Sequence, residues 1–252
     1  MPFYANATEF LRAVQARYRA LQAYSDTGLV RSFPFRRKRP KLSSLLRDRA
    51  LPRDVRRVLA ESAQRPAPRK RPFRNRPHET QFSTAYRAPG LFRFAFSKQH
   101  PYWPLRHIIV AEHVCGSDGS GPYQYRHSRH REELQRPPSL ELAVAGATGI
   151  SAGSAHTIGT LLFEECDGFT LLNMRRIRFR GEREIDGVAC MGVTGRHPRG
   201  GRVTAWFGVQ DLMLRCVVEP RTGSQEFRFN IRVDDIDPTI SFDAPVCTPR
   251  AA

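Results

Sequence analysis

The sequence lacks the features that mark several common protein classes. In 252 residues no apolar run reaches the ~18 residues that a membrane-spanning helix requires, so we expect no integral helical membrane protein. The 5 cysteines include no CxxC pair, which argues against a structural zinc site or a redox motif. The glycine-rich stretch 146–159 contains neither the G-x-G-x-x-G of a dinucleotide site nor the G-K-[ST] of a phosphate loop.

The first residues also lack a targeting pattern. Residues 1–20 contain no basic start, no apolar core of 7 to 15 residues and no small-residue cleavage site, which a secretory signal requires. From these residues we expect either a cytoplasmic protein or one whose signal is missing from this reading frame.

Positive charge is concentrated in one part of the sequence. The formal net charge is +17, and residues 36–76 hold sixteen basic residues against three acidic ones. The segment 36–77 is rich in arginine and proline, so it buries too little apolar surface to offset its ordering entropy, and we predict an inserted, mobile loop. Its clusters are candidates for binding phosphates of nucleic acid or of anionic lipid head groups: Arg36, Arg37, Lys38, Arg39, Arg69, Lys70 and Arg71. A solvated insertion explains the same composition, and a GC-rich genome also favours arginine, so nucleic acid is the less favoured partner.

Strand-like alternation is most regular between residues 176 and 233. Apolar side chains alternate with polar ones at 227, 229, 231 and 233, and a similar pattern occurs at 212–218 and 177–179. The dipeptides Asp186-Gly187 and Gly200-Gly201 are typical of hairpin turns. The C-terminal part is therefore predicted to be an antiparallel meander, with cysteines 190 and 216 as buried, reduced thiols.

The preceding part mixes helices and strands. A helix is predicted from Thr8 to near Tyr24, followed by a turn at Ser25-Asp26 and a strand over 28–35. Further strands are predicted over 80–86, 91–97 and 106–114, with a turn at Pro89-Gly90. Two small, apolar helices are predicted next, the first over Leu134 to Ala147 and the second ending at Leu162. Helices of this kind suit a cover over a hydrophobic concavity.

Signals for catalysis or metal binding are weak. The only cluster resembling ligands comprises His107, His113, His127, His130 and Cys115, and it has no carboxylate at a fixed offset. His156 follows a serine, but residues 153–156 do not form the nucleophile elbow of a hydrolase. We predict a protein that is not an enzyme and that has no cofactor and no metal site.

Three sets of segments carry a resemblance to a known family: the strand-turn-strand at 84–94, the small-residue helices at 142–157 and the hairpins at 186–190, 203–207 and 212–215. They resemble the LolA-like superfamily of bacterial periplasmic lipoprotein carriers. The resemblance implies one α+β domain over 1–252, mainly antiparallel β: a strongly curved, unclosed β-barrel sheet with an N-terminal helix and short helices over its concave face. It also implies a periplasmic or cell-envelope location. In carriers an arginine just before the turn proline helps to hold the lid shut, whereas Ala88 occupies that position here.

Two functional hypotheses follow. In the first, the protein carries a lipid, an acyl chain or an acylated protein between the sheet and the helices, in an apolar site. The residues expected to line it are Phe92, Phe94, Phe96, Leu142, Ile158, Leu161, Trp206, Phe227, Phe229 and Ile231. In the second, the same faces form a filled core, and the protein is a structural or interaction module whose basic insertion binds nucleic acid or an anionic membrane surface.

Overall fold

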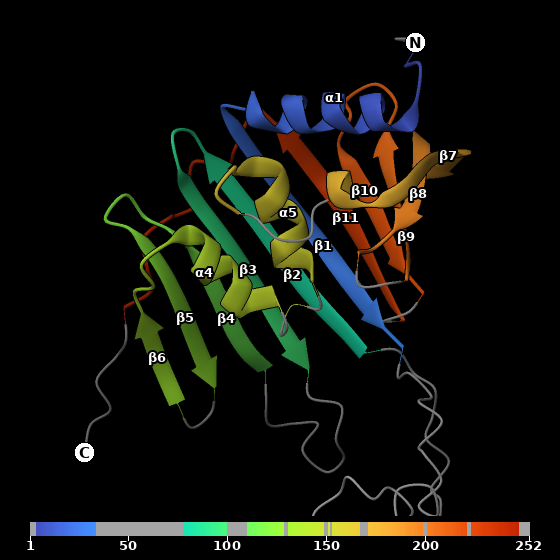
Figure 1. The fold of residues 1–252 in the computed structure, drawn as a ribbon. Helices are drawn as coiled ribbons and strands as arrows, with labels where there is room; N and C mark the ends of the chain where they lie inside the picture. Colours follow the sequence, from blue (N-terminus) through green and yellow to red (C-terminus); the bar gives the residue numbers. More distant parts are fainter. Residues whose placement is uncertain are drawn as a thin grey trace, which may run out of the picture. The chain divides into compact units, whose positions relative to one another are not determined.

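The strands form a single antiparallel sheet whose two end strands do not pair with each other. The computed structural model describes residues 4–33, 78–99, 110–128, 131–148, 151, 153–166, 171–198, 201–220 and 223–246. Its strands are β1 (Ala23–Ser32), β2 (His78–Arg87), β3 (Leu91–Gln99), β4 (Val110–Ser117), β5 (Pro122–Ser128), β6 (Arg131–Gln135), β7 (Arg175–Ile185), β8 (Val188–Arg196), β9 (Arg202–Gly208), β10 (Leu214–Glu219) and β11 (Ser224–Val233). The 11 strands lie in the order β6-β5-β4-β3-β2-β1-β11-β10-β9-β8-β7 (Figure 1). The predicted basic insertion at 36–77 lies outside the described residues.

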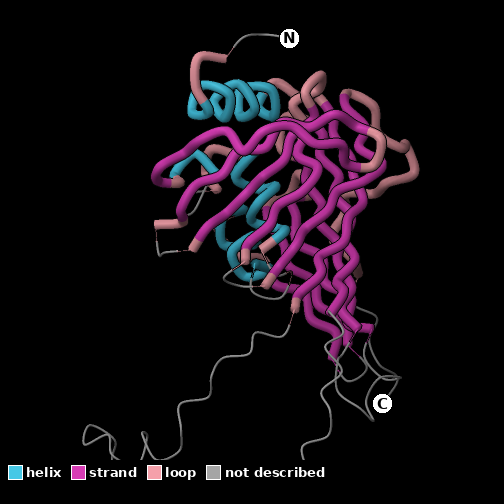
Figure 2. Tube along the Cα trace, turned by 90° about the vertical axis from the view of Figure 1, so that its right-hand side faces the viewer, coloured by secondary structure: helices cyan, strands magenta, loops and turns pink. Residues whose placement is uncertain are grey.

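The helices lie on one side of this sheet, which curves around them (Figure 2). They are α1 (Ala7–Arg19), α4 (Leu140–Thr148) and α5 (Ser154–Leu162), with a short 3₁₀ turn, η2 (Leu171–Asn173). Helix α4 contacts β4, β5 and α5, while α1 contacts α5, β7 and η2. The unclosed, curved antiparallel sheet with helices on its concave face confirms the predicted fold class.

Helix α1 shows how its sequence sets its bounds. The Asn6 side chain accepts hydrogen bonds from the backbone N–H groups of Thr8 and Glu9, which satisfies two of the orphan donors at the helix start. The apolar face predicted for this helix is buried: Phe10, Leu11, Val14 and Tyr18. The helix ends at Arg19 instead of near Tyr24, because β1 already begins at Ala23.

The predicted turn at Ser25-Asp26 is wrong. Both residues lie inside β1, where Ser25 is opposite Ala85 of β2 and Asp26 is opposite Thr84. Ser25 and Asp26 are typical turn formers in isolation, but β1 is a central strand with partners on both sides, and strand pairing overrides the local preference. A buried aspartate therefore lies where the sequence suggested a solvated turn.

Strand β11 does not keep one apolar face along its length. Between Thr27 and Ser25 the partner residue on β11 moves from Phe229 to Arg232, so β11 holds one extra residue there. Asn230 adopts a left-handed backbone, with φ at 50°, at this bulge. As a result Phe227 and Phe229 lie on one face of the sheet, whereas Ile231 packs against the main core on the other.

Apolar clusters occupy both faces of the sheet. The main core lies between the concave face and the helices, and Phe10 of α1 contacts Phe207 of β9 there. The adjacent residue, Trp206, points to the opposite face and packs with Ile185, Cys190 and Cys216. We call this second cluster the convex cluster.

The other sequence expectations are largely confirmed for the described residues. The turn at Pro89-Gly90 and the hairpin at Asp186-Gly187 are present, and the two small helices follow β6, which contains Leu134. Cysteines 115, 166, 190 and 216 are buried free thiols, while Cys247 lies outside the described residues. No helix among the described residues is long and apolar enough to span a bilayer.

Candidate functional site

Six of the ten residues predicted to line an apolar site belong to the main core or pack against it. Phe92, Phe94 and Phe96 of β3 are almost fully buried in the main core together with Ile158 and Leu161 of α5. Ile231 is partly buried and packs against the same core. The Phe82 and Phe94 rings stack with centroids 5.3 Å apart, which places aromatic surface directly opposite the helix.

The other four residues lie elsewhere. Leu142 is 51% exposed because α4 turns Leu140, Ala143 and Val144 toward the sheet instead. Trp206 belongs to the convex cluster, where Phe227 packs against it. Phe229 stacks on Phe227 at 6.3 Å, on that same face. The expectation that these aromatic residues share a face with Phe92 is therefore wrong. For the two residues on β11, Phe227 and Phe229, the bulge at Asn230 is the reason.

A buried ion cluster joins α5 to the sheet. Arg228 of β11 is only 1% exposed, and its guanidinium lies 2.5 Å from Asp26 Oδ2 and 2.5 Å from Glu226 Oε1. It also donates to the backbone carbonyl of Ser154, the first residue of α5, at 3.1 Å. Its carbon Cζ lies 4.8 Å from the centre of the Phe82 ring. Arg228 thus connects the floor of the concave face with the start of the covering helix.

Two tyrosines extend this cluster to α1. The Tyr24 hydroxyl donates to Asp26 Oδ2 at 2.5 Å, and the Tyr18 hydroxyl of α1 accepts from the backbone N–H of Leu214 at 3.0 Å. Burial raises the pKa of Tyr18 to about 12 and raises that of Tyr24 well above its usual value. Both phenols therefore remain protonated at neutral pH and act as fixed hydrogen-bonding groups.

The cluster is charged unevenly and is not fully satisfied. Two carboxyl groups face one guanidinium, and burial raises the pKa of Glu226 above its usual value of 4.5 even though Arg228 opposes the shift. Burial lowers the pKa of Arg228, but the charges of Asp26 and Glu226 outweigh it, so the net shift is upward. Oδ1 of Asp26 has no hydrogen-bond partner among the described residues. Leaving a buried carboxylate oxygen unpaired is costly, so the packing of α5 on the sheet carries an energetic penalty at Asp26.

Helix α4 is attached by a different polar contact. The side-chain amide of Gln124, on β5, donates to the backbone carbonyls of Ala143 at 2.6 Å and Leu142 at 3.3 Å. A side chain at Gly146 would meet this amide at 2.1 Å, so the absence of a Cβ there permits the close approach. The remaining residues that α4 turns toward the sheet are apolar.

Two hollows lined by described residues lie between the sheet and the helices, and both are small. The hollow lined by Leu11, Val14, Thr160 and Leu161, between α1 and α5, has a volume of about 10 Å³. The hollow between α4 and the strands at Phe96 is equally small, at about 10 Å³. That is roughly the room for one water molecule, and an acyl chain needs far more.

The residues with potential ligand chemistry do not gather into a metal site. Among the described residues, no group of three or more His, Cys, Asp or Glu side chains is placed to hold a metal ion. His113 stacks on Phe96 with ring centroids 5.1 Å apart, Cys115 is buried in the core, and His127 lies across from Glu132 in the β5–β6 pairing. His107 and His130 lie outside the described residues.

Residues 149–153, Gly-Ile-Ser-Ala-Gly, do match the G-x-S-x-G pattern. Ser151 is fully buried, and its hydroxyl accepts from the backbone N–H of Ala155 at 3.2 Å. It precedes α5 and follows α4, whereas a nucleophile elbow joins a strand to a helix. The Ser151 hydroxyl therefore satisfies a backbone donor in the first turn of α5, whose N-cap residue is Gly153.

No local pattern in the sequence predicted the ion cluster. Asp26 has the composition of a turn residue, and Arg228 occupies the alternate position that normally faces water. Only the pairing of β1 with β11 brings these two residues together across 202 positions. A pair of this kind would show in a comparison of related sequences as coupled positions, which one sequence does not reveal.

Comparisons with known proteins give no family for the chain and only distant structural similarities. No family model and no curated protein matches the chain. Among solved structures, the lipoprotein LppX from Mycobacterium tuberculosis is similar at 11% identity and a TM-score of 0.48, covering 94% of this chain and 98% of that one. LprF from Mycobacterium bovis is similar at 12% identity and a TM-score of 0.42, covering 97% and 96%. A putative outer membrane lipoprotein-sorting protein domain from Vibrio parahaemolyticus is similar at 8% identity and 0.36, covering 90% and 92%.

Proposed function

We propose that the protein is a non-enzymatic binding protein that holds a lipid, an acyl chain or the acyl group of a protein between the concave face and helices α4 and α5. One observation carries this proposal. The two helices cover an aromatic, apolar surface and are attached to it by two small sets of polar contacts, made by Arg228 and Gln124 to backbone carbonyls. Thr157 of α5 adds a hydrogen bond to the Glu226 side chain, and the described main core across this boundary is apolar, so an alkyl chain can replace those core contacts without loss of hydrogen bonds.

Because the two hollows lined by described residues are too small for an acyl chain, binding at these places requires the helices to move away from the sheet. The unpaired Oδ1 of Asp26 and the raised pKa of Glu226 both reduce the net stabilisation of the closed state. An acyl chain entering the space would contact Phe92, Phe94 and Ile158. In this proposal Arg228 holds the covering helix on the sheet, because it binds the start of α5 from β11. The resemblance assigns that role to an arginine before the turn proline.

The location that accompanies this proposal is the bacterial cell envelope, where carriers of the LolA-like superfamily act. The support for it is the sequence resemblance.

Buried cysteines provide the test of this movement. Cys115 lies beneath α4, and Cys166 packs next to Gly159 of α5, whereas Cys190 and Cys216 lie in the convex cluster. All four thiols are buried, so each reacts with an alkylating reagent only after an opening event. We expect pulsed alkylation of the full chain, read by peptide mass spectrometry, to modify Cys115 and Cys166 faster than the other two. Oleic acid should change the rates of those two thiols alone.

A matched pair of variants separates opening of the helices from general loosening. Gln124→Ala removes the polar attachment of α4 and should increase the alkylation rate of Cys115 at least severalfold. Gln81→Ala changes the same residue type at an exposed position of β2 and should leave the rate unchanged. Native mass spectrometry of protein purified from bacteria should in addition show bound lipid. One common alkylation rate for all four thiols, together with no bound lipid or oleic acid, would establish the filled-core module instead.

A further inference from the structure

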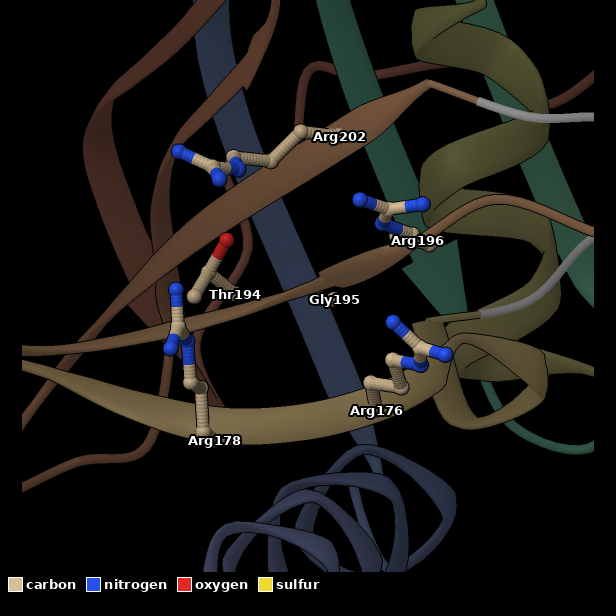
Figure 3. A pocket seen from close by; sticks show the side chains of 6 residues that line it. All are labelled: Arg176, Arg178, Thr194, Gly195, Arg196 and Arg202. Carbon is tan, nitrogen blue, oxygen red and sulfur yellow. The ribbon is translucent and has the colours of Figure 1, made fainter.

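A second candidate site lies where β7 begins, β8 ends and β9 begins, away from the helices. Its pocket has a volume of about 250 Å³ and is lined by Arg176, Arg178, Thr194, Gly195, Arg196 and Arg202. Figure 3 shows the four arginine side chains surrounding it. Val193 and Val203 of the same strands point into the main core, so Thr194 and Arg202 point to the opposite, convex face. We call this site the arginine pocket.

Strand pairing forces positive charges together in the arginine pocket. Arg196 and Arg202 are direct cross-strand partners, and Arg178 is opposite Thr194 in the neighbouring row. Like charges placed directly opposite one another destabilise a sheet. None of the ion pairs formed between described residues involves any of these four arginines, and no carboxylate lines the pocket. The repulsion is therefore not offset within the described part of the chain.

Backbone geometry adds to this concentration of charge. Between Arg175 and Arg178 the strand β7 holds an extra residue relative to β8, and Arg176 adopts a left-handed backbone with φ at 56°. A residue other than glycine takes this conformation at an energetic cost, and such residues are frequent at functional sites. Here the bulge lies next to the pocket, and Arg176 is part of its lining.

A simpler explanation accounts for only half of the charge. Strand β7 lies at the edge of the sheet, and exposed charges on an edge strand prevent unwanted pairing with other chains. Arg176 and Arg178 serve that purpose. Arg196 and Arg202 lie on β8 and β9, which have neighbours on both sides, and edge protection does not explain them.

We propose that the arginine pocket binds a phosphate group, either as inorganic phosphate or as the phosphate of a lipid head group. Guanidinium groups bind phosphate oxygens through two parallel N–H donors. Several positively charged guanidinium groups around one hollow attract the negative charge of a phosphate. The Thr194 hydroxyl donates to the Val203 carbonyl, so the arginines are the donors that remain for a ligand. The pocket is smaller than the ~300 Å³ of the smallest drug-sized sites, which fits phosphate or a glycerophosphate group. The site lies on the face opposite the proposed acyl-binding space and does not depend on it.

The first experiment uses the full chain and inorganic phosphate. Isothermal titration calorimetry at constant ionic strength should show one site in the native protein, and affinity at least tenfold weaker in Arg196→Gln/Arg202→Gln. The control Arg12→Gln/Arg232→Gln removes the same charge from exposed positions outside the pocket and should bind within twofold of the native protein. Because the substitutions at 196 and 202 remove a repulsive pair, that variant should melt, without phosphate, at a higher temperature than the native protein, and it should lose the rise that phosphate causes.

The second experiment distinguishes the two sources of phosphate. Vesicles of phosphatidylglycerol and phosphatidylcholine are compared with vesicles of phosphatidylcholine alone. If the ligand is a lipid head group, the native protein should bind the anionic vesicles, free phosphate should compete, and the variant at 196 and 202 should bind more weakly than the control. Equal vesicle binding by both variants, with phosphate binding lost only in the pocket variant, identifies free phosphate. Unchanged binding of both phosphate and vesicles by the pocket variant would overturn the proposal.

Discussion

At the scale of single residues, the concave face depends on a buried charge cluster whose acids outnumber its base. Arg228 makes contacts with Asp26, Glu226, Thr84 and the start of α5. Replacing one partner of such a cluster leaves a buried charge uncompensated, which typically costs ~3–5 kcal/mol. Asp26 and Arg228 are therefore the two positions at which a single substitution is least tolerated.

The pH dependence of stability reports on Glu226. Its pKa is higher in the folded protein than its usual value of 4.5, so the folded state binds this proton more tightly than the unfolded state does. The stabilisation from protonated Glu226 is fully present below pH 4.5 and is lost as pH rises through the raised pKa. We expect the free energy of unfolding to fall with pH in this range, and the Glu226→Gln variant to lack that part of the decrease.

Urea denaturation at pH steps from acid to neutral measures this difference. Gln at position 226 keeps an oxygen to accept from Arg228, and Asp26 remains as the counter-charge, so folding should be retained. Glu79→Gln, which removes an exposed carboxylate paired with Arg31, is the control and should keep the native pH slope. An identical slope in the Glu226→Gln protein would show that Glu226 keeps its usual pKa when folded.

At the scale of elements, the attachment of α4 rests on the absence of one side chain. An added Cβ at Gly146 would lie 2.1 Å from the Gln124 amide and would displace it from the Ala143 carbonyl. Losing a buried hydrogen bond costs ~1–3 kcal/mol, whereas alanine favours a helix over glycine by ~1 kcal/mol. We expect Gly146→Ala to destabilise the native protein and to be neutral or stabilising in the Gln124→Ala background. Chemical denaturation of the four proteins gives the coupling energy, and additive effects would show that the two residues do not interact.

The elements also show which inferences a single sequence supports. Regular alternation at Phe92, Phe94 and Phe96 predicted both the strand and its buried face, because β3 contains no bulge. The same alternation at 227–231 misassigned Phe227 and Phe229, because one extra residue at Asn230 exchanges the faces and leaves no mark in the apolar pattern. The Asp26 to Arg228 pair was missed for another reason. Burial of a charge depends on a partner 202 residues away, and local propensity contains no information about it.

At the scale of the whole molecule, β1 and β2 form a hairpin whose ends lie together, with Ser32 opposite His78. A short turn is therefore sufficient to connect these strands. We expect replacement of residues 33–77 by Asn-Gly, the preferred two-residue hairpin turn, to keep the melting temperature within a few degrees and to keep the circular dichroism of the sheet. In the same variant we expect loss of the salt-sensitive binding to nucleic acid or anionic vesicles proposed for the basic clusters at 36–39 and 69–71. Unfolding of the shortened chain would show that the removed residues contribute to the core.

The pairing of β1 with β11 has a consequence for the order of folding. Strands β1 to β6 and strands β7 to β11 each pair with their neighbours in sequence, so both halves form through comparatively local contacts. Within the described sheet, the β1–β11 pairing is the one strand pairing that joins the halves, and it brings together residues separated by about 200 positions. A chain emerges from the ribosome N-terminus first. The edge of β1 that pairs with β11 therefore stays unpaired until nearly the whole protein has been synthesised. The nascent chain therefore carries an unpaired, central strand edge for most of translation, and this is the stage at which it is most exposed to aggregation.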